Sequence, residues 1–362
     1  MAVEVRRTEF AKASSLFEGF PYDRSWLTAA LASADSRMFV DDPSSPGVAL
    51  LCYRDGLCLI AGEPNAETAL DIIRAATESS SDPPRFSWVS LPSDEWADVF
   101  RSAFGCRFYV FQRVSLTFER TNTPLLRQPT KAPDGFTLSR IDLALARRIT
   151  EEIDRSFGLL WPSPEEFVEK SLGFCLTEDD TIVTVAYSAF EPKERMCLSV
   201  ATVPDHRGRG FAAMTCAPLV RRCLENDVEP EWGASLNNRA SLSVARKLGF
   251  ANEVLHHWAQ RCPFNADRRA VEMPPSALEE YVGEYRGGER MLVISRKGAL
   301  LFFHEELPRP RLPEQELAAD AHDSFFMRAL DAQLLFKRGE SGNVSSFVLH
   351  IAGRQHMIER VG

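Results

Sequence analysis

The segment Thr202–Ala212 constrains the fold of this chain more than any other part of the sequence. It reads Thr-Val-Pro-Asp-His-Arg-Gly-Arg-Gly-Phe-Ala and follows an apolar, strand-like run that includes Val200. Pro204 helps to end that strand because proline has no N–H to donate to a neighbouring strand. From Gly210 onward, apolar residues recur at the spacing of a helix. The sequence therefore predicts a strand, a glycine-containing loop and a helix in direct succession.

This loop has the composition of a phosphate-binding site. Gly208 and Gly210 carry no Cβ, so the backbone can come close to a ligand there. The N–H groups and the positive dipole end of the following helix attract anions. Arg207 and Arg209 add positive charge. Because short Gly/Arg patterns also occur in ordinary surface turns, the loop alone leaves the ligand open.

A second segment, Asn238–Phe250, comes after the predicted helix and narrows the interpretation. Asn238 is a typical helix N-cap, and Gly249 is a typical stop signal before a strand that begins at Phe250. In this order and separation, the two segments resemble the acyl-CoA-binding core of the GNAT N-acetyltransferase superfamily. The resemblance implies a GNAT fold of the α/β (α+β) class, with acetyl-CoA as co-substrate and an amine as acceptor.

Three further segments are similar to the GNAT family that includes the zwittermicin A resistance acetyltransferase. They are Trp161–Phe167, Gly173–Leu176 and Pro230–Trp232, and the likeness runs from about residue 30 to residue 262. It implies a small-molecule acceptor, an aminated metabolite or an antibiotic. Trp161 and Trp232 are then expected to be walls of the acceptor pocket, with simple packing in the core as the alternative.

The resemblance also implies a set of contacts to acetyl-CoA. The pantetheine arm is expected beside Val200, Ala201, Thr202 and Val203, and the pyrophosphate on the N–H groups of Arg207, Gly208, Arg209, Gly210, Phe211 and Ala212. Asn238 and Ser241 are expected to contact the arm or its phosphates, although Asn238 could equally serve only as a helix cap.

The proton-handling residues depart from the superfamily pattern. Cys197 and Ala201 occupy the positions where many relatives place a carboxylate, and Ala245 occupies that of a tyrosine acid. Substitute bases are sought among Glu152, Asp154, Glu165, Glu166, His256 and His257, and Ser241 or Ser243 could donate a proton to the thiolate. Structural roles for all of these, a mechanism without a base, and Cys197 as an acyl-accepting nucleophile remain open alternatives.

The N-terminal region echoes the order of the motif-bearing region. Ser93–Gly105 parallels Asn238–Gly249, since each predicts a helix that ends at glycine before a strand. In place of the phosphate loop, however, it reads Gly62-Glu63-Pro64-Asn65. The acidic side chain would repel phosphate, and the proline removes an N–H donor. We therefore expect a degenerate GNAT-like repeat that does not bind CoA, with an unrelated α/β module as the alternative.

After Phe264 the chain predicts short strands separated by turns, with a hairpin loop over 339–343. The expected strands are Arg290–Ser295, Leu300–His304, Ser324–Met327, Gln333–Lys337, Ser346–Ile351 and His356–Arg360. This spacing favours a small antiparallel barrel or sandwich. The run Tyr281–Tyr285 entering the strands resembles the lipocalin-like domain that follows some hydrolase domains.

We therefore expect four regions in this 362-residue chain. They are a degenerate GNAT-like domain over 1–120, a linker over 121–134, the acetyltransferase domain over 135–265 and the lipocalin-like β domain over 275–362.

Charge and composition restrict the partners and the location. Lys and Arg number 42 against 51 Asp and Glu, a net charge of −9, which argues against nucleic acid as the main partner. The sequence predicts neither a membrane span nor a signal peptide. The eight cysteines lie mostly in apolar runs without a Cys-x-x-Cys pair, so we expect reduced core residues, no metal site and a cytoplasmic enzyme.

Two other functions stay open from the sequence alone. One is acetylation of a peptide or protein amine. The other is a non-catalytic protein that binds acetyl-CoA and acts in regulation or interaction.

Overall fold

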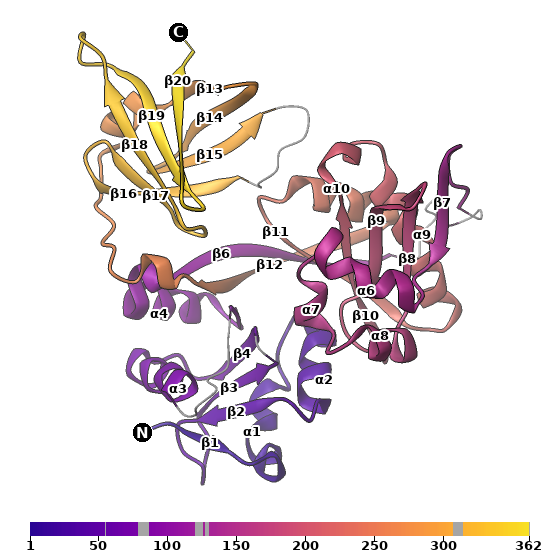
Figure 1. Cartoon of the computed structure of the whole chain (residues 1–362). Coiled ribbons are helices and arrows are strands. Elements are labelled where there is room, and N and C mark those ends of the chain that lie inside the picture. Colours follow the sequence, from indigo (N-terminus) through magenta and orange to yellow (C-terminus); the bar gives the residue numbers. More distant parts are fainter. Residues whose placement is uncertain (55, 79–86, 120–125, 127–129, 307–313, 362) are drawn as a thin grey trace. The chain divides into compact units, whose positions relative to one another are not determined.

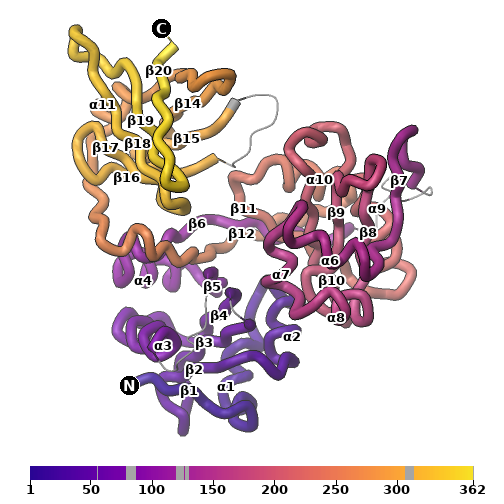
Figure 2. Tube along the Cα trace, viewed as in Figure 1, coloured from indigo at the N-terminus to yellow at the C-terminus, as the bar shows by residue number. Residues whose placement is uncertain are grey.

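The computed structural model describes residues 1–361 except 55, 79–86, 120–125, 127–129 and 307–313 (Figures 1 and 2). The chain divides into two compact units. The first unit comprises Met1–Val99 and Phe111–Ala259, and the second comprises Phe100–Val110 and Gln260–Gly362.

Strands β1 to β12 form a single sheet. Their bounds are β1 (Val3–Val5), β2 (Arg37–Val40), β3 (Val48–Tyr53), β4 (Leu57–Gly62), β5 (Trp88–Leu91), β6 (Phe108–Phe118), β7 (Phe136–Arg140), β8 (Gly173–Glu178), β9 (Thr181–Ser188), β10 (Arg195–Thr202), β11 (Glu229–Ser235) and β12 (Phe250–Arg261). Their order across the sheet is β1-β2-β3-β4-β5-β12-β6-β11-β10-β9-β8-β7. The helices are α1 (Ala11–Ser14), α2 (Arg24–Ala32), α3 (Ala66–Glu78), α4 (Asp94–Phe104), α6 (Leu143–Glu152), α7 (Phe157–Leu160), α8 (Pro164–Lys170), α9 (Phe211–Glu225), α10 (Arg239–Leu248) and α11 (Pro275–Leu278).

In the middle of this sheet, each of its two halves pairs with the strand that follows the other half in the chain, so the halves exchange strands. The N-terminal half contributes β1–β5 and the C-terminal half β7–β11, and each half is followed in the chain by one more strand. β6, which follows the N-terminal half, pairs with β11 over the register Glu231↔Thr117 to Ser235↔Arg113. β12, which follows the C-terminal half, lies between β5 and β6, and Figure 1 shows β6 and β12 running side by side. Neither half therefore completes its own sheet.

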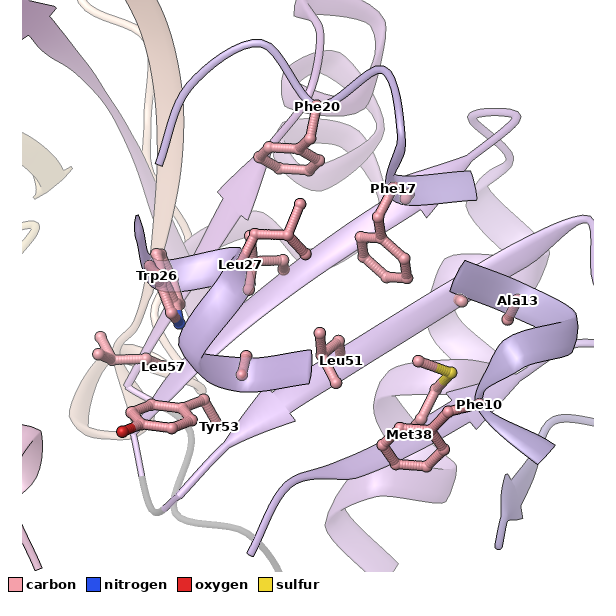
Figure 3. Packing of buried hydrophobic residues seen from close by; sticks show 14 of the residues in the cluster. Phe10, Ala13, Phe17, Phe20, Trp26, Leu27, Met38, Leu51, Tyr53 and Leu57 are labelled. Atoms are coloured by element: carbon pink, nitrogen blue, oxygen red, sulfur yellow. The ribbon is translucent and has the colours of Figure 1, made fainter. Parts of the chain in front are cut away.

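The N-terminal half is built on two fully buried strands. β3 and β4 read Val-Ala-Leu-Leu-Cys-Tyr and Leu-Cys-Leu-Ile-Ala-Gly, which are near-continuous apolar runs. Such runs are typical of strands covered on both faces. On one face, Trp26 of α2 packs against the sheet together with Phe10 and Phe17, which lie just before and just after α1, as Figure 3 shows. α3 contacts β1, β2 and β3.

In the C-terminal half, β8, β9 and β10 are antiparallel neighbours. The helical segment that follows Asp142 is interrupted. α6 ends at Glu152, and α7 is a separate turn of helix. The break has a local cause: the Asp154 carboxylate accepts hydrogen bonds from the N–H (3.0 Å) and the hydroxyl (2.6 Å) of Ser156. This side chain-to-backbone bond competes with the helix.

The second unit contains a closed antiparallel barrel of strands β13 to β20. They are β13 (Gly283–Gly287), β14 (Arg290–Lys297), β15 (Leu300–Glu306), β16 (Gln315–Ala321), β17 (Ser324–Met327), β18 (Ala332–Arg338), β19 (Val344–Ile351) and β20 (Arg354–Arg360). Pairing of β13 with β20 closes the ring and removes its edges. The expectation of a small barrel and of its six strands is confirmed, while β13 and β16 were not predicted.

The barrel interior is packed with side chains. Tyr281, Tyr285, Phe325, Phe336 and Phe347 are buried in one cluster, and Phe336 lies 4.8 Å from Tyr281 and 5.2 Å from Phe347 between ring centroids. A small barrel filled in this way is a hydrophobic core. In the described part of the chain, no helix has both the length and the apolar character needed to cross a membrane.

Candidate active site

The neighbouring strands β10 and β11 part near the middle of the sheet. They are parallel and pair only over Arg195↔Glu229, Met196↔Pro230 and Cys197↔Glu231. Beyond that point β10 continues to Thr202 beside β9, and β11 continues to Ser235 beside β6. The described residues thus form a wedge between two strands that elsewhere belong to one sheet.

Hydrogen bonds to the outer neighbours fix which backbone groups face this wedge. Val203 N donates to Val183 O (3.0 Å) and Ala189 N donates to Cys197 O (2.8 Å), so the odd-numbered residues of β10 turn their backbone groups towards β9. Strand alternation leaves those of Leu198, Val200 and Thr202 facing the wedge.

The same argument applies to β11. Leu236 N donates to Gln112 O (3.0 Å), on the strand that pairs with β11 at its outer edge. Alternation therefore turns the backbone groups of Gly233 and Ser235 towards the wedge. Both sides of the wedge present N–H and C=O groups that an extended molecule could pair with. The Val203 N–H is already hydrogen-bonded to β9, so it cannot serve the pantetheine arm. The N–H donors that β10 offers to the wedge are therefore those of Val200 and Thr202.

The loop after β10 leads to the N-terminus of α9. Gly208 and Gly210 have φ of +76° and +84°, a backbone conformation that side chains disfavour. A Cβ at either glycine would meet no atom within 4 Å, so backbone conformation is the local reason for both glycines. Gly210 is the N-cap of α9, and among the described residues no side-chain cap is formed at this helix end. Its first N–H groups therefore have no intrahelical acceptor and are available to an anion.

The arginines of the loop differ in their contacts. Arg207 Nε donates to the Thr202 carbonyl at 3.1 Å, which ties the loop back to the end of β10. The guanidinium of Arg209 lies 4.6 Å from the ring centroid of Phe211 and 5.2 Å from that of Phe136. Phe211 is itself buried, and Ala212 is half-buried. Both arginines thus add positive charge beside the uncapped helix end.

The second segment, around α10, is anchored by its cap. Asn238 Oδ1 accepts from Ser241 N at 3.1 Å, and Gly249 ends the helix at φ +100°, so both predicted helix signals are confirmed. The hydroxyl of Ser241 accepts from Trp232 Nε1 at 3.1 Å. Trp232 is 2% exposed and packs on Phe250 at 5.4 Å. Trp232 and Phe250 lie in the core that β11 shares with α9 and α10.

Trp161 is also a core residue. It is 4% exposed, packs on Phe167 and donates from Nε1 to Ser188 O at 2.8 Å. Next to it, Ser163 caps α8 by accepting a hydrogen bond from Glu166 N, and Pro164 occupies the first turn. Each of the two tryptophans expected as pocket walls is therefore buried among hydrophobic residues.

Three of the carboxylates considered as bases form exposed ion pairs. Glu152 contacts Arg148 at 2.6 Å, Glu165 contacts Arg147 at 2.7 Å and Glu166 contacts Lys170 at 3.0 Å. The hydrogen bond from Arg147 lowers the pKa of Glu165, which makes that carboxylate a weaker base.

A polar cluster centred on the buried Tyr187 includes Asp154 and Ser199, and Ser199 lies on β10, one of the two strands of the wedge. The Tyr187 hydroxyl, on β9, donates to Asp154 Oδ2 at 2.7 Å and also interacts with the Ser199 side chain. Ser199 lies opposite Tyr187 in the register and on the same strand as Val200. Burial, followed by the charge of Asp154, raises the pKa of Tyr187, so its hydroxyl stays protonated at neutral pH. No sequence motif marks Tyr187 or Ser199, because both occupy ordinary strand positions.

Two further candidates lie where the wedge begins. Burial raises the pKa of the Cys197 thiol to about 12, with a smaller contribution from Glu231, so the thiol is not a nucleophile at neutral pH. Glu231, directly opposite Cys197, accepts hydrogen bonds from Ser25 Oγ (2.5 Å) and Arg195 Nη1 (3.0 Å). Both oxygens of the Glu231 carboxylate are therefore already engaged in hydrogen bonds within the protein.

The histidines of β12 lie in the same unit. His256 is stacked on Tyr22 with 3.8 Å between ring centroids and shares a 2.9 Å hydrogen bond with Ser115. Burial lowers the pKa of His256 to about 3, so it is a weak base. His257 Nδ1 lies 3.0 Å from Asp94. Ser243, a further candidate donor, is an exposed residue of α10.

The loop of the N-terminal half that corresponds to the phosphate loop is filled by the protein itself. Asn65 Oδ1 accepts from Thr68 N at 2.9 Å and so caps the start of α3. Trp96 Nε1 donates to Gly62 O at 2.9 Å, and a Cβ at Gly62 would lie 2.0 Å from Gly47 O. The uncapped helix end seen at α9 has no counterpart at this loop.

A separate pocket of about 490 Å³ lies on the barrel unit, where Leu300, Leu317 and Val271 are among its lining residues. Burial raises the pKa of Glu316 in its wall, and this carboxylate accepts from the Tyr109 hydroxyl at 3.3 Å. None of its lining residues belongs to the parting strands, so the pocket is not part of the candidate active site.

Comparison with known proteins agrees with this geometry. Residues 14–256 match the model of the GNAT acetyltransferase family. An uncharacterized N-acetyltransferase of Bacillus subtilis (strain 168), YdfB, is 24% identical over 213 residues, which cover 59% of this chain and 80% of the relative. The crystal structure of a GCN5-related N-acetyltransferase-like protein from Streptococcus suis 89/1591 is similar with a TM-score of 0.58 at 25% identity, covering 70% of this chain and 99% of that one.

The fold and its parted strands define the class of protein as an enzyme that transfers acetyl groups. The chain belongs to the GNAT acetyltransferase family and is an N-acetyltransferase. The family match includes the N-terminal half.

Enzymes of this family use acetyl-CoA, which supplies an acetyl group activated as a thioester. The residues present fit this co-substrate, because the uncapped N-terminus of α9 suits a pyrophosphate and the wedge offers backbone partners to an extended arm. Among the described residues, no group of three or more His, Cys, Asp or Glu side chains could hold a metal ion.

Proposed function

We propose that this enzyme transfers the acetyl group of acetyl-CoA directly to the primary amine of a small molecule, an aminated metabolite or antibiotic. The observation that carries the proposal is the combination of the β10–β11 wedge with the uncapped N-terminus of α9 at its mouth. The wedge holds the pantetheine arm against Val200 and Thr202. The loop over 207–212 holds the pyrophosphate, with Arg207 and Arg209 adding charge.

The N-terminal half has a supporting role in this proposal. Asn65 and Trp96 fill the region that corresponds to the phosphate loop, and Glu63 adds an unfavourable negative charge. We infer that this half binds no CoA and completes the sheet around the single site.

Proton transfer is assigned to the cluster beside the wedge. Asp154 accepts the proton that the attacking amine loses, through the Tyr187 hydroxyl, which is held at 2.7 Å from its carboxylate, and the same pair returns a proton to the CoA thiolate as the C–S bond breaks. A backbone N–H of Val200 or Thr202 stabilises the negative charge that develops on the carbonyl oxygen. Asp154→Asn is expected to lower kcat about 100-fold with little change in acetyl-CoA affinity. An unchanged kcat would remove Asp154 from the mechanism.

Other features support the acceptor and the location. The net charge of −9 favours a cationic amine over nucleic acid. All eight cysteines are unpaired, as expected in the reducing cytoplasm, where we propose that the enzyme works. Acetylation of a peptide or protein amine is the second candidate, because the same wedge is compatible with it.

The decisive experiment is a thiol-release assay with acetyl-CoA over a panel of amines that includes aminopolyols, aminoglycosides, amino acids and peptides. Turnover with a small amine supports the proposal, and turnover with peptides alone favours the second candidate. Confirmed CoA binding without turnover of any amine would contradict both.

A charge reversal tests the phosphate loop. Arg207→Glu should abolish the rise in melting temperature that acetyl-CoA causes, because the loop then repels the pyrophosphate. Arg74→Glu is the matched control, since it makes the same charge change at an exposed position of α3. Equal stabilisation of both variants by acetyl-CoA would show that the loop is misassigned.

A further inference from the structure

The side chain of Arg113, on β6, lies on the face of the sheet opposite α9 and α10. Its neighbours Val114 and Leu116 point into the core beneath these helices, so alternation places Arg113 on the other face. Arg113 pairs in register with Ser235 of β11, one of the two strands that form the wedge. The residue is only half-buried and can be reached by a small ligand.

The guanidinium of Arg113 lacks hydrogen-bond acceptors among the described residues. Its Nε is buried without a partner, and no described carboxylate forms a direct ion pair with it. The guanidinium stacks on the ring of Trp258, with its carbon 3.8 Å from the ring centroid. A buried N–H donor without an acceptor is costly, so the Nε group of Arg113 favours a ligand that supplies one.

Two neighbours hold this side chain in place. Asp23 Oδ2 accepts from Trp258 Nε1 at 2.9 Å and from Ser90 Oγ at 2.7 Å. The buried carboxylate thereby orients the indole on which Arg113 stacks, and its charge attracts the guanidinium without a direct contact. The planar guanidinium of Arg113 is thus held in one orientation, while its N–H donors stay available to a ligand.

The guanidinium of Arg113 lies beside the wedge between β10 and β11. A Cβ at Gly233 would be 3.1 Å from an Nη atom of Arg113, so the guanidinium rests against the backbone of this glycine. Gly233 is the second residue of β11 beyond the last pair with β10, and its backbone groups face the wedge. It is level with Ser199, whereas Val203 lies four residues, roughly 13 Å at 3.3 Å per residue, further along, and α9 begins only after the loop that follows, at Phe211. An anion bound by Arg113 is therefore not the pyrophosphate.

We propose that Arg113 binds a carboxylate of the acceptor, so that the acceptor is an amine that also carries a carboxylate, such as an amino acid. A carboxylate matches the planar fork with two parallel N–H···O bonds. Gly233 is glycine because a side chain there would displace the fork. This inference rests on the proposed function, since it identifies the acceptor class of the same site.

The test compares L-amino acids with their α-carboxamides as acceptors in the thiol-release assay on the full-length enzyme. The carboxamide keeps the amine and the size but loses the charge. The wild-type enzyme should favour the acid at least about tenfold in kcat/KM, the order expected for a hydrogen bond to a charged group. Arg113→Met should abolish this preference by slowing only the acids, while the carboxamides react as before. Equal use of acid and carboxamide by the wild type would overturn the inference and leave the transferase function standing.

Gly233→Ala keeps the charge and moves the fork, so it tests the site without removing Arg113. It should also reduce the preference for acids, whereas Gly19→Ala, whose Cβ would meet no atom within 4 Å, should leave it unchanged. Melting temperatures with the amino acids alone give a readout without turnover. Acids that stabilise the wild type but not Arg113→Met support the site even if no amine is acetylated, a result that would contradict the proposed function only. Acids that stabilise neither protein, combined with no preference in turnover, would overturn the site.

Discussion

At the scale of single residues, the glycines of the phosphate loop are required for a different reason from the one first inferred. The sequence suggested that Gly208 and Gly210 leave room for a ligand. Each has open space where a Cβ would lie, and each has positive φ. The local constraint is therefore the left-handed backbone, which turns the end of β10 into the uncapped start of α9.

Substitutions at Gly210 should follow this conformational constraint. Gly210→Ala is expected to lower the free energy of unfolding by about 1–2 kcal/mol. Gly210→Asn should cost less, because asparagine tolerates positive φ. Chemical denaturation measures both, with Gly19→Ala as a control at a glycine of ordinary φ. Equal losses for Ala and Asn would contradict a purely conformational role.

The lowered pKa of His256 predicts how the free energy of unfolding changes with pH. Its pKa is lowered to about 3, first by burial and then by the positive charge of Arg113. The unfolded chain, with a pKa near 6.5, binds the proton more readily, so His256 contributes its full stability above about pH 6.5 and loses it as pH falls. Between pH 6.5 and 5 the loss should reach about 2 kcal/mol, at 1.36 kcal/mol per pH unit.

The contribution of His256 can be isolated from that of the carboxylates by comparing variants. The free energy of unfolding of His256→Asn should fall less steeply between pH 7 and 5 than that of the wild type. His322→Asn, at an exposed position of the second unit, is the control and should keep the wild-type slope. A parallel pH dependence of wild type and His256→Asn would show that this histidine is protonated in the folded protein.

At the scale of elements, the sequence predicts those features that depend only on residues close together in the chain, such as the start of a helix. The caps at Asp142, Ser163 and Asn238 mark the starts of α6, α8 and α10, because a short side chain bonds the helix N-terminus nearby in sequence. β16 was missed because Gln-Glu-Leu-Ala-Ala-Asp-Ala has few residues that favour strands. Its place in the barrel comes from pairing with β15 and β17 instead.

Helix α10 offers a test that separates a cap from a ligand contact. Asn238→Ala should lower the free energy of unfolding by about 1 kcal/mol, because Ser241 N loses its acceptor. Asn238→Ser should restore most of this loss, since serine is also a good N-cap. Denaturation curves together with acetyl-CoA titrations measure the two effects. Weakened acetyl-CoA binding in a fully stable Asn238→Ser variant would show that the asparagine amide contacts the co-substrate.

At the scale of the whole molecule, sequence reasoning could identify the halves but not the exchange between them. Val114 and Leu116 alternate with polar residues and so predict a half-buried strand. This pattern is the same whichever strand lies next to β6. The partner, β11, is more than a hundred residues away, and only the packing of the complete sheet selects it. For the same reason Arg113, Glu231 and Tyr187, which converge on the wedge from three strands, carry no motif that links them.

The exchange predicts that the two halves of the first unit unfold together. Leu116, on the strand that follows the N-terminal half, is 1% exposed in the core of the C-terminal half. Leu116→Ala should therefore lower the stability of both halves by about 2–5 kcal/mol. Native-state hydrogen exchange measures this, through equal losses of protection in β3–β4 and β8–β9. Leu236→Ala, at a 40% exposed position just after β11, is the control and should change neither. Loss of protection in β8–β9 alone would mean that the N-terminal half is stable without the partner strand, and that the exchange joins two independently folding halves.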